Sequence, residues 1–399
     1  MVKKKNGGIG LKKSFIVFLV GLYLLFGGGI TTYGEEPGID LASQATSAIL
    51  IERDTGEVLF EKNSKEQLPP ASMTKVMTML LIMEAIDTGK IKWSDKVRTS
   101  ERAASMGGSQ IFLEPGEEMT VEEMMKGIAI ASGNDASVAM AEHLAGSEEQ
   151  FVNLMNEKAK ELGLKNTKFL NSNGLPAENH YSSAEDLALM AKELLKYEEI
   201  TKYTSLYEDY LREDTEDKFW LVNTNKLVKF YPGVDGLKTG FTNEAKYCLT
   251  ASANKDGMRI IAVVMGAPTP KDRNRQVTEM LDYAYSQYEL QPRYQRGDVL
   301  GEAKVSKGST VTVPVETEEN ISLLLKKGES PEGITERLEL NQSISAPVKK
   351  GDPLGTLFVE KDGEVLMQSK VVAESDVAKA SLWTLMKRTT SILVGKNGF

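Results

Sequence analysis

Apolar residues recur with two different periods along the chain, and each period predicts a different kind of element. Residues 48–52 and 57–61 alternate between apolar and polar side chains around a central Asp-Thr-Gly turn, which predicts a β-hairpin. After a pair of prolines, the almost continuous apolar stretch 72–86 predicts a buried helix that begins at Ser72.

The next part of the chain carries the start signals of further helices. Thr120-x-x-Glu123 is a capping box, in which each side chain bonds the backbone of the other residue. Ser182-x-x-Glu185 has the same form, so Ser182 is expected to cap a helix. The expected helices cover residues 120–131, 135–145 and 182–196.

From residue 234 onward the pattern changes to that of strands. Strands are predicted over 236–242, 247–253 and 258–266, followed by a helix over 270–288. The order hairpin, helices, strands, helix places strands from both ends of the segment in one antiparallel sheet flanked by helices. The sequence therefore predicts an α+β domain over residues 39–290.

Two smaller parts are expected after the boundary at Gln291-Pro-Arg293. The first is a small all-β domain over residues 294–373, with frequent turn signals and no residues that suggest chemistry. The second is an amphipathic helix over residues 374–399, whose apolar face comprises Ala378, Leu382, Leu385, Met386, Ile392 and Leu393. A helix lying on a membrane and a helix packed on the β domain both fit this pattern. The positive charge of Lys379, Lys387 and Arg388 favours the membrane surface.

The N-terminus indicates export. Five lysines precede an apolar run from Phe15 to Phe26, which is short for a membrane span and typical of a signal peptide. Thr32-Tyr-Gly34 supplies small residues for cleavage, so residues 1–34 are expected to be removed. An uncleaved N-terminal anchor is the alternative. In either case the folded part is expected outside the cell, secreted or on the outer face of the cytoplasmic membrane.

Composition narrows the possible functions. The formal net charge of -9 argues against nucleic acid as a partner. The single cysteine, Cys248, cannot form an internal disulfide and is interpreted as a buried strand residue. His143 and His180 are interpreted as structural, because neither has an acidic partner at the spacing of a catalytic triad. No cluster has metal-ligand spacing, so neither a metal nor a cofactor is expected.

Three short motifs provide chemistry without a histidine. In Ser72-Met-Thr-Lys75, a lysine three residues after a serine lies on the same helical face, where its neutral amine can accept the serine proton. In Ser132-Gly-Asn134, a second hydroxyl and an amide follow the end of a helix; helix capping explains this motif equally well.

The third motif, Lys238-Thr239-Gly240, lies on a predicted strand. Its glycine lets a substrate backbone approach the strand, and its lysine and threonine can bind a carboxylate. A second cation near Lys75 would also lower the pKa of that amine, and Lys238 is the natural candidate.

In order and separation these motifs resemble those of the low-molecular-mass penicillin-binding proteins, the serine D-alanyl-D-alanine carboxypeptidases. The resemblance extends over essentially the whole chain and includes the Gly107–Leu113 loop and Lys238-Thr-Gly-Phe-Thr242. It implies a catalytic domain of the penicilloyl serine transferase and β-lactamase type.

The resemblance also implies roles for individual residues. Ser72 would be the acyl-ester nucleophile and Lys75 its proton acceptor, with Ser132 and Asn134 moving the proton and orienting the substrate. Lys238, Thr239 and Gly240 would bind the substrate. The backbone N–H groups of Ser72 and Phe241 would form the oxyanion hole. Arg273, or as a weaker candidate Arg275, would bind the substrate carboxylate.

The expected function is removal of the terminal D-alanine from peptidoglycan stem peptides that end in D-Ala-D-Ala, with β-lactams as inhibitors. A class A β-lactamase is the nearest alternative, although Gly133 stands where that class has Asp and the Glu-x-x-Leu-Asn motif is missing. A non-catalytic protein that binds the cell wall is the second alternative.

Overall fold

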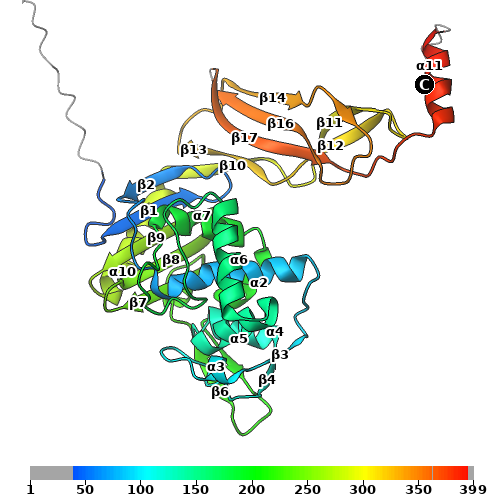
Figure 1. Cartoon of the computed structure of the whole chain (residues 1–399). Helices are drawn as coiled ribbons and strands as arrows, with labels where there is room; N and C mark the ends of the chain where they lie inside the picture. The colour runs from blue at the N-terminus through cyan, green and yellow to red at the C-terminus, as the bar shows by residue number, and fades with distance from the viewer. Residues whose placement is uncertain (1–38, 362, 394–399) are drawn as a thin grey trace, which may run out of the picture. The chain divides into compact units, whose positions relative to one another are not determined.

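The computed structural model describes residues 39–361 and 363–393 (Figure 1). The predicted signal peptide, residues 1–34, lies outside the described residues. The described residues form an α+β domain, an all-β domain and a C-terminal helix.

A five-stranded antiparallel sheet forms the centre of the α+β domain. Its strands run in the order β2-β1-β9-β8-β7, so the N-terminal hairpin joins strands that follow almost two hundred residues later. In β1, Ile49 lies opposite Val263 of β9. The expected sheet with strands from both ends of the domain is confirmed. Its members are β1 (Ser47–Glu52), β2 (Val58–Lys62), β7 (Val234–Thr242), β8 (Lys246–Lys255) and β9 (Met258–Ala267).

Helices cover both faces of this sheet (Figure 1). On one face, α10 (Pro270–Gln287) buries Val277, Met280 and Leu281 against the strands. On the other face, α7 (Ala184–Leu194) packs on β1 and β9 and contacts α2 (Lys75–Asp87). Most of α2 is buried around its whole circumference, which explains why its sequence shows an apolar run rather than an amphipathic stripe.

The remaining elements of this domain are short or lie around α2. The helices are α3 (Glu101–Ala104), α4 (Val121–Ala129), α5 (Asn134–Ala145), α6 (Glu148–Glu161), α8 (Thr201–Thr204), α9 (Leu227–Phe230) and the 3-10 turn η2 (Glu198–Ile200). Two small hairpins pair β3 (Lys96–Arg98) with β4 (Glu118–Thr120) and β5 (Glu208–Leu211) with β6 (Phe219–Val222).

Two predicted helix starts are displaced. The α-helix expected from Ser72 begins at Lys75, because Ala71–Thr74 forms a separate 3-10 turn, η1, whose first residue has a φ of 48°. The cap of α7 is Ser183 rather than Ser182: the Ser183 side chain accepts from the Asp186 N–H. Ser182 instead exchanges two backbone hydrogen bonds with Leu68.

The all-β domain contains a six-stranded sheet in the order β14-β16-β17-β12-β11-β15 and a pair formed by β10 and β13. Its core is made of aliphatic side chains such as Val315, Leu323 and Val359. The strands are β10 (Tyr288–Tyr294), β11 (Val299–Ser306), β12 (Thr312–Thr317), β13 (Ile321–Lys326), β14 (Ile334–Leu340), β15 (Ile344–Ser345), β16 (Pro353–Lys361) and β17 (Glu364–Ala373).

The expected boundary residues 291–293 lie inside a strand rather than in a linker. Gln291 pairs with Leu323 and Pro292 with Ser322 in the two-stranded β10–β13 pair. A proline is compatible with such an edge strand because its missing N–H can face away from the partner.

The C-terminal helix, α11 (Leu382–Leu393), begins later than predicted, and residues 394–399 of the prediction lie outside the described residues. Residues 374–381 are not helical, because their backbone bonds to the all-β domain: Val377 bridges to Val348, and Lys379 bridges to Gly308. Of the predicted apolar face, Ala378 therefore lies outside the helix.

Candidate active site

Ser72 lies in the 3-10 turn η1, immediately before α2. Its side chain is half-buried, whereas Lys75, the first residue of α2, is fully buried. Lys75 Nζ lies 3.1 Å from Ser72 Oγ, so the amine and the hydroxyl are in hydrogen-bond contact. The predicted pairing of these two residues is present in the fold.

Lys75 Nζ has two further partners, and both can only accept a hydrogen bond. It lies 2.6 Å from Asn134 Oδ1 and 2.7 Å from the carbonyl oxygen of Asn173. Burial, followed by the nearby charge of Lys238, holds the pKa of the Lys75 amine well below its usual value, against an opposing effect of Asp135. A neutral amine has two N–H bonds and one lone pair. If the N–H bonds go to Asn134 and Asn173, the lone pair faces the Ser72 hydroxyl.

Asn134 is itself held by its neighbours. Its Nδ2 donates to the Gly107 carbonyl at 2.7 Å, which leaves Oδ1 facing Lys75. Its backbone N–H donates to the Ser109 carbonyl. The loop 107–113, identified by resemblance, thus orients the amide that contacts the lysine.

Ser132 lies between α4 and α5 in a left-handed conformation, with a φ of 64°. Its Oγ is buried and has no hydrogen-bond partner in the described part of the chain. A buried hydroxyl without a partner is costly, and a non-glycine residue with positive φ is strained; both features are typical of functional sites.

Lys238, Thr239 and Gly240 lie on β7, which packs beside η1. Lys238 is buried, and burial together with the charge of Arg273 lowers the pKa of its amine to about 7. Thr239 Oγ1 donates to Thr224 Oγ1 at 2.7 Å. At Gly240, a Cβ would come within 2.8 Å of the Pro70 carbonyl, so glycine allows the strand to approach the nucleophile turn.

Phe241 follows on the same strand, with its ring stacked on Tyr247 and 49% exposed. Its ring therefore lies outside the core.

Arg273 and Arg275 lie in different environments on α10. Arg273 is 6% exposed, and desolvation lowers the pKa of its guanidinium to about 10. Its charge acts on Lys238, so the two cations are neighbours. Arg275 is instead at the surface, where it pairs with Glu279. This arrangement favours Arg273 for a ligand carboxylate.

Sequence reasoning missed two members of this site. Asn173 contributes only a backbone carbonyl, so its side chain gives no signal, although the Asn-Ser-Asn-Gly run at 171–174 is typical of a turn. Asp135 is buried, and its carboxylate accepts from the N–H groups of Ile111 and Leu113. Its place directly after the Ser132 motif was the available signal.

A groove of about 350 Å³ lies beside the nucleophile turn. It is lined by residues that include Pro70, Ala71, Leu175, His180, Thr242 and Glu244. Within residues 39–361 and 363–393 no group of three or more His, Cys, Asp and Glu side chains could hold a metal ion. Cys248 is buried in β8, as the sequence predicted.

Taken together, the serine turn, the buried lysine and the cationic strand on this sheet define a penicilloyl serine transferase fold with a serine-lysine site. A family model described as D-alanyl-D-alanine carboxypeptidase matches residues 33–269, and the model of the penicillin-binding protein 5 C-terminal domain matches residues 288–379. The chain belongs to the D-alanyl-D-alanine carboxypeptidase family and is a serine-type carboxypeptidase.

Named relatives agree with this assignment. The chain is 63% identical over 382 residues to D-alanyl-D-alanine carboxypeptidase DacF of Bacillus subtilis (strain 168), covering 95% of this chain and 98% of that protein. The structure of penicillin-binding protein 5 from Haemophilus influenzae matches with a TM-score of 0.67 and 31% identity, over 84% of this chain and 98% of that one.

A third relative concerns ligands. Penicillin-binding protein D2 from Listeria monocytogenes, solved in an ampicillin-bound form, matches with a TM-score of 0.54 and 29% identity, over 60% of this chain and 96% of that one. The expected family, fold class and enzyme activity are confirmed by these comparisons.

Proposed function

We propose that this carboxypeptidase removes the terminal D-alanine from peptidoglycan stem peptides that end in D-Ala-D-Ala, through an acyl-enzyme on Ser72. The observation that carries the proposal is the set of contacts around Lys75 Nζ: a neutral amine that donates its two N–H bonds to Asn134 and Asn173 keeps its lone pair for the Ser72 hydroxyl. A serine hydroxyl is a weak nucleophile until an adjacent base takes its proton.

In acylation, Ser72 Oγ attacks the carbonyl carbon of the penultimate D-alanine while its proton passes to Lys75. The tetrahedral intermediate then expels the nitrogen of the terminal D-alanine. That nitrogen receives a proton through the Ser132 hydroxyl, whose Oγ has no competing partner among the described residues. Lys75 returns to its neutral form as it replaces the proton that Ser132 gives up, a transfer that requires Ser132 Oγ, which has no hydrogen-bond partner among the described residues, to approach Nζ in the substrate complex. Water then hydrolyses the ester and restores the Ser72 hydroxyl.

The substrate's terminal carboxylate is assigned to Lys238, Thr239 and Arg273. Two neighbouring buried cations are unfavourable on their own, and an anion between them relieves that cost. The backbone N–H groups of Ser72 and Phe241 are proposed as the oxyanion hole, and the close approach of β7 to η1 at Gly240 supports this.

β-Lactams are proposed as inhibitors that acylate the same serine. The ampicillin-bound relative supports this proposal.

The test is D-alanine release from a peptide ending in Lys-D-Ala-D-Ala, with and without prior penicillin, using Ser72→Ala as the control. Release that penicillin abolishes is the expected result. Rapid penicillin hydrolysis without D-alanine release would mean a β-lactamase. The absence of both D-alanine release and penicillin hydrolysis would indicate a protein that only binds the cell wall.

For location, we propose that the enzyme is exported and held on the outer face of the cytoplasmic membrane by α11. The helix exposes Leu382, Trp383 and Met386 by 82%, 64% and 59%, with Lys387 on the same helix. An exposed apolar face with neighbouring positive charge fits the headgroup region of an anionic membrane. None of the helices in the described ranges is long and apolar enough to cross a membrane.

Binding to vesicles tests this proposal. The wild type is expected to sediment with vesicles of anionic phospholipid, and a variant with Leu382, Trp383 and Met386 changed to Gln is expected to remain in solution with unchanged activity on a soluble peptide. If the variant still binds the vesicles, α11 is not the membrane anchor, and its packing on the all-β domain is the better interpretation.

A further inference from the structure

The turn that carries Ser72 is strained and lacks a cap of its own. Ala71 has a left-handed φ of 48°, although it is not glycine. Neither the 3-10 turn nor the start of α2 has a side-chain cap: Pro70 and Thr74 occupy the two cap positions without such a bond. A strained conformation persists only where the surrounding structure holds it, so other parts of the fold must position Ser72.

Besides β7, which approaches η1 at Gly240, the segment of residues 170–181 supports the turn. Gly174 presses so closely on the turn that a Cβ there would lie 1.9 Å from the Ala71 carbonyl oxygen. The carbonyl of Ser172 accepts from Thr78 on α2, and the carbonyl of Asn173 accepts from Lys75. His180 adds a side-chain hydrogen bond from this segment to η1 itself.

The His180 ring joins two backbone segments. Its Nδ1 accepts from the Leu170 N–H at 3.0 Å, and its Nε2 lies 2.8 Å from Thr74 Oγ1. Because Nδ1 accepts a hydrogen bond from the Leu170 N–H, the neutral ring carries its proton on Nε2, which donates to the Thr74 hydroxyl. The tautomer is thus fixed by a main-chain group, and the ring presents a donor to the residue two positions after Ser72.

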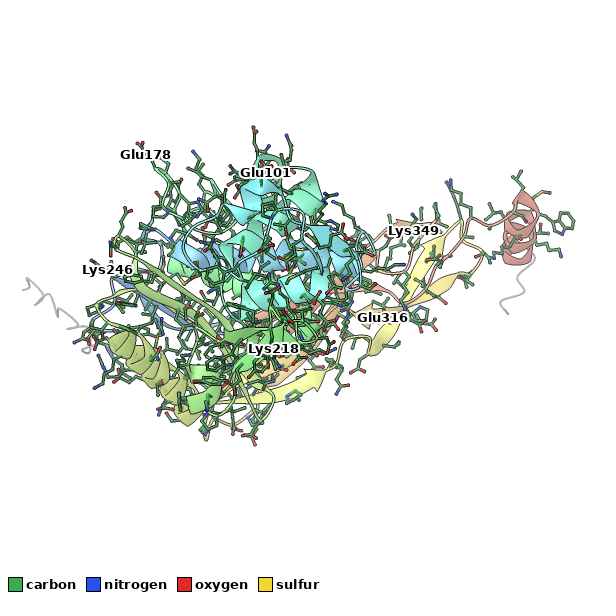
Figure 2. The ribbon with its side chains drawn as sticks, turned by 90° about the horizontal axis from the view of Figure 1, so that it is seen from below. Glu101, Glu178, Lys218, Lys246, Glu316 and Lys349 are labelled. Carbon is green, nitrogen blue, oxygen red and sulfur yellow. The ribbon has the colours of Figure 1, made fainter. Side chains whose placement is uncertain are left out.

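The ring is held in place and kept neutral. Its own backbone is fixed because Tyr181 pairs with Lys168 and Ser182 pairs with Leu68. The ring lies edge-on to Phe169, and burial lowers the pKa of His180 to about 4. In the same loop, Glu178 points outward into solvent (Figure 2).

We propose that His180 is a positioning residue for acylation: through its Nε2–H bond to Thr74 it fixes the turn that aims Ser72 Oγ at Lys75. The proposal rests on the acyl-enzyme chemistry proposed above. It assigns the histidine no contact with substrate. Its importance comes from geometry, since a displacement of a reacting group by about 1 Å can cost about a hundredfold in rate.

The experiment measures acylation by a fluorescent penicillin, separating the rate constant at saturation from the concentration needed for half-saturation. Thr74→Val keeps the shape and removes the hydroxyl, and Thr74→Ser keeps the hydroxyl. His180→Leu removes both ring bonds, and His180→Gln keeps an N–H donor near the Nε2 position. The matched control is His143→Leu, because His143 is the other histidine of the chain and is exposed on α5.

The expected result is a fall of about tenfold or more in the acylation rate constant for Thr74→Val and His180→Leu, with half-saturation nearly unchanged. Thr74→Ser, His180→Gln and His143→Leu are expected to retain most of the rate. The double variant Thr74→Val/His180→Leu is expected to be little slower than either single variant, because both remove the same bond. A structural role alone would lower the melting temperature and leave the rate of the folded fraction unchanged.

Nitrogen NMR of ring-labelled histidine provides an independent readout. In the wild type, the His180 signals are expected to report protonation at Nε2 only and to stay constant between about pH 8 and 5, and Thr74→Val should shift them. Protonation at Nδ1, or normal acylation in folded His180→Leu, would overturn the proposal. Penicillin acylation without D-alanine release would reject the substrate assignment and leave the test of His180 intact.

Discussion

Lys75 and Asn134 meet in the interior of the domain, with Nζ and Oδ1 2.6 Å apart, although 59 residues separate them in sequence. The other end of the same amide is bound to the Gly107 carbonyl, so Asn134 cannot turn without breaking a bond. The orientation of the Lys75 amine therefore depends on the Asn134 amide, which is held by its hydrogen bond to the Gly107 carbonyl.

Replacing Lys75 tests the base directly. Lys75→Ala removes the proton acceptor, and Lys75→Arg supplies a group that stays protonated, so both are expected to slow acylation by about 10²–10⁴-fold. The measurement is the rate of fluorescent penicillin labelling in folded protein. Acylation near the normal rate in Lys75→Ala would mean that Lys75 is not the base that accepts the Ser72 proton.

The pH dependence follows from two lowered pKa values. The Lys75 amine must be neutral to act as a base, so activity rises with pH through its lowered pKa. Lys238 must be protonated to bind a carboxylate, and its pKa of about 7 in the free enzyme predicts that kcat/KM falls again above that pH.

A matched pair of substrates separates the two limbs. The acid limb is expected for both the D-Ala-D-Ala peptide and the same peptide ending in a carboxamide, whereas the alkaline limb is expected only for the carboxylate. An alkaline limb of equal size with the carboxamide would mean that Lys238 does not act through the terminal carboxylate.

Ser132→Ala is expected to separate activity from stability. Because Ser132 Oγ makes no hydrogen bond in the described structure, its removal should change the free energy of unfolding by less than about 1 kcal/mol. D-Alanine release should fall by about 10²-fold or more, since the leaving nitrogen loses its proton donor. Denaturant unfolding measures the change in stability, and steady-state kinetics measures the change in D-alanine release. A normal rate of D-alanine release would mean that another group protonates the leaving nitrogen.

Gly174→Ala tests the support under the nucleophile turn. Its Cβ would lie 1.9 Å from the Ala71 carbonyl oxygen, so the turn must move, with an expected loss of about 2 kcal/mol or more of stability and slower acylation. Thermal unfolding and the rate of fluorescent penicillin labelling measure the two effects.

Gly163→Ala is the matched control for this substitution. Gly163 has a similar left-handed φ of 73°, but nothing lies within 4 Å of the place that an added Cβ would occupy. The Gly163→Ala variant has backbone strain similar to that of Gly174→Ala but no steric clash, so its acylation rate should be normal. Equal acylation rates in the two variants would contradict the proposed support.

The three motifs could be read from the sequence because each one depends on side chains at short, fixed spacing. Ser72 and Lys75 need only one helical turn to meet, and Lys238 needs only to lie on a strand. Arg273 came from the resemblance and stays a prediction; the structure shows that it is buried and that its charge acts on Lys238.

Other features could not be predicted because main-chain contacts decide them. Asn173 contributes a carbonyl, and any residue type provides one. Ser182 and Ser183 are equivalent as helix caps by sequence, and only the pairing of Ser182 with Leu68 selects Ser183. Similarly, the non-helical course of residues 374–381 follows from bridges to Gly308 and Val348, which are distant in sequence, rather than from their own helical pattern.

The carbonyl of Asn173 has a consequence for variation at this position. Since the lysine contacts only the main chain there, the side chain of residue 173 is exempt from the demands of proton transfer. That side chain is buried, and its Oδ1 accepts from the Leu175 N–H at 2.9 Å, so it holds the turn whose carbonyl contacts Lys75. A substitution at position 173 would therefore act on the base only through the path of the main chain.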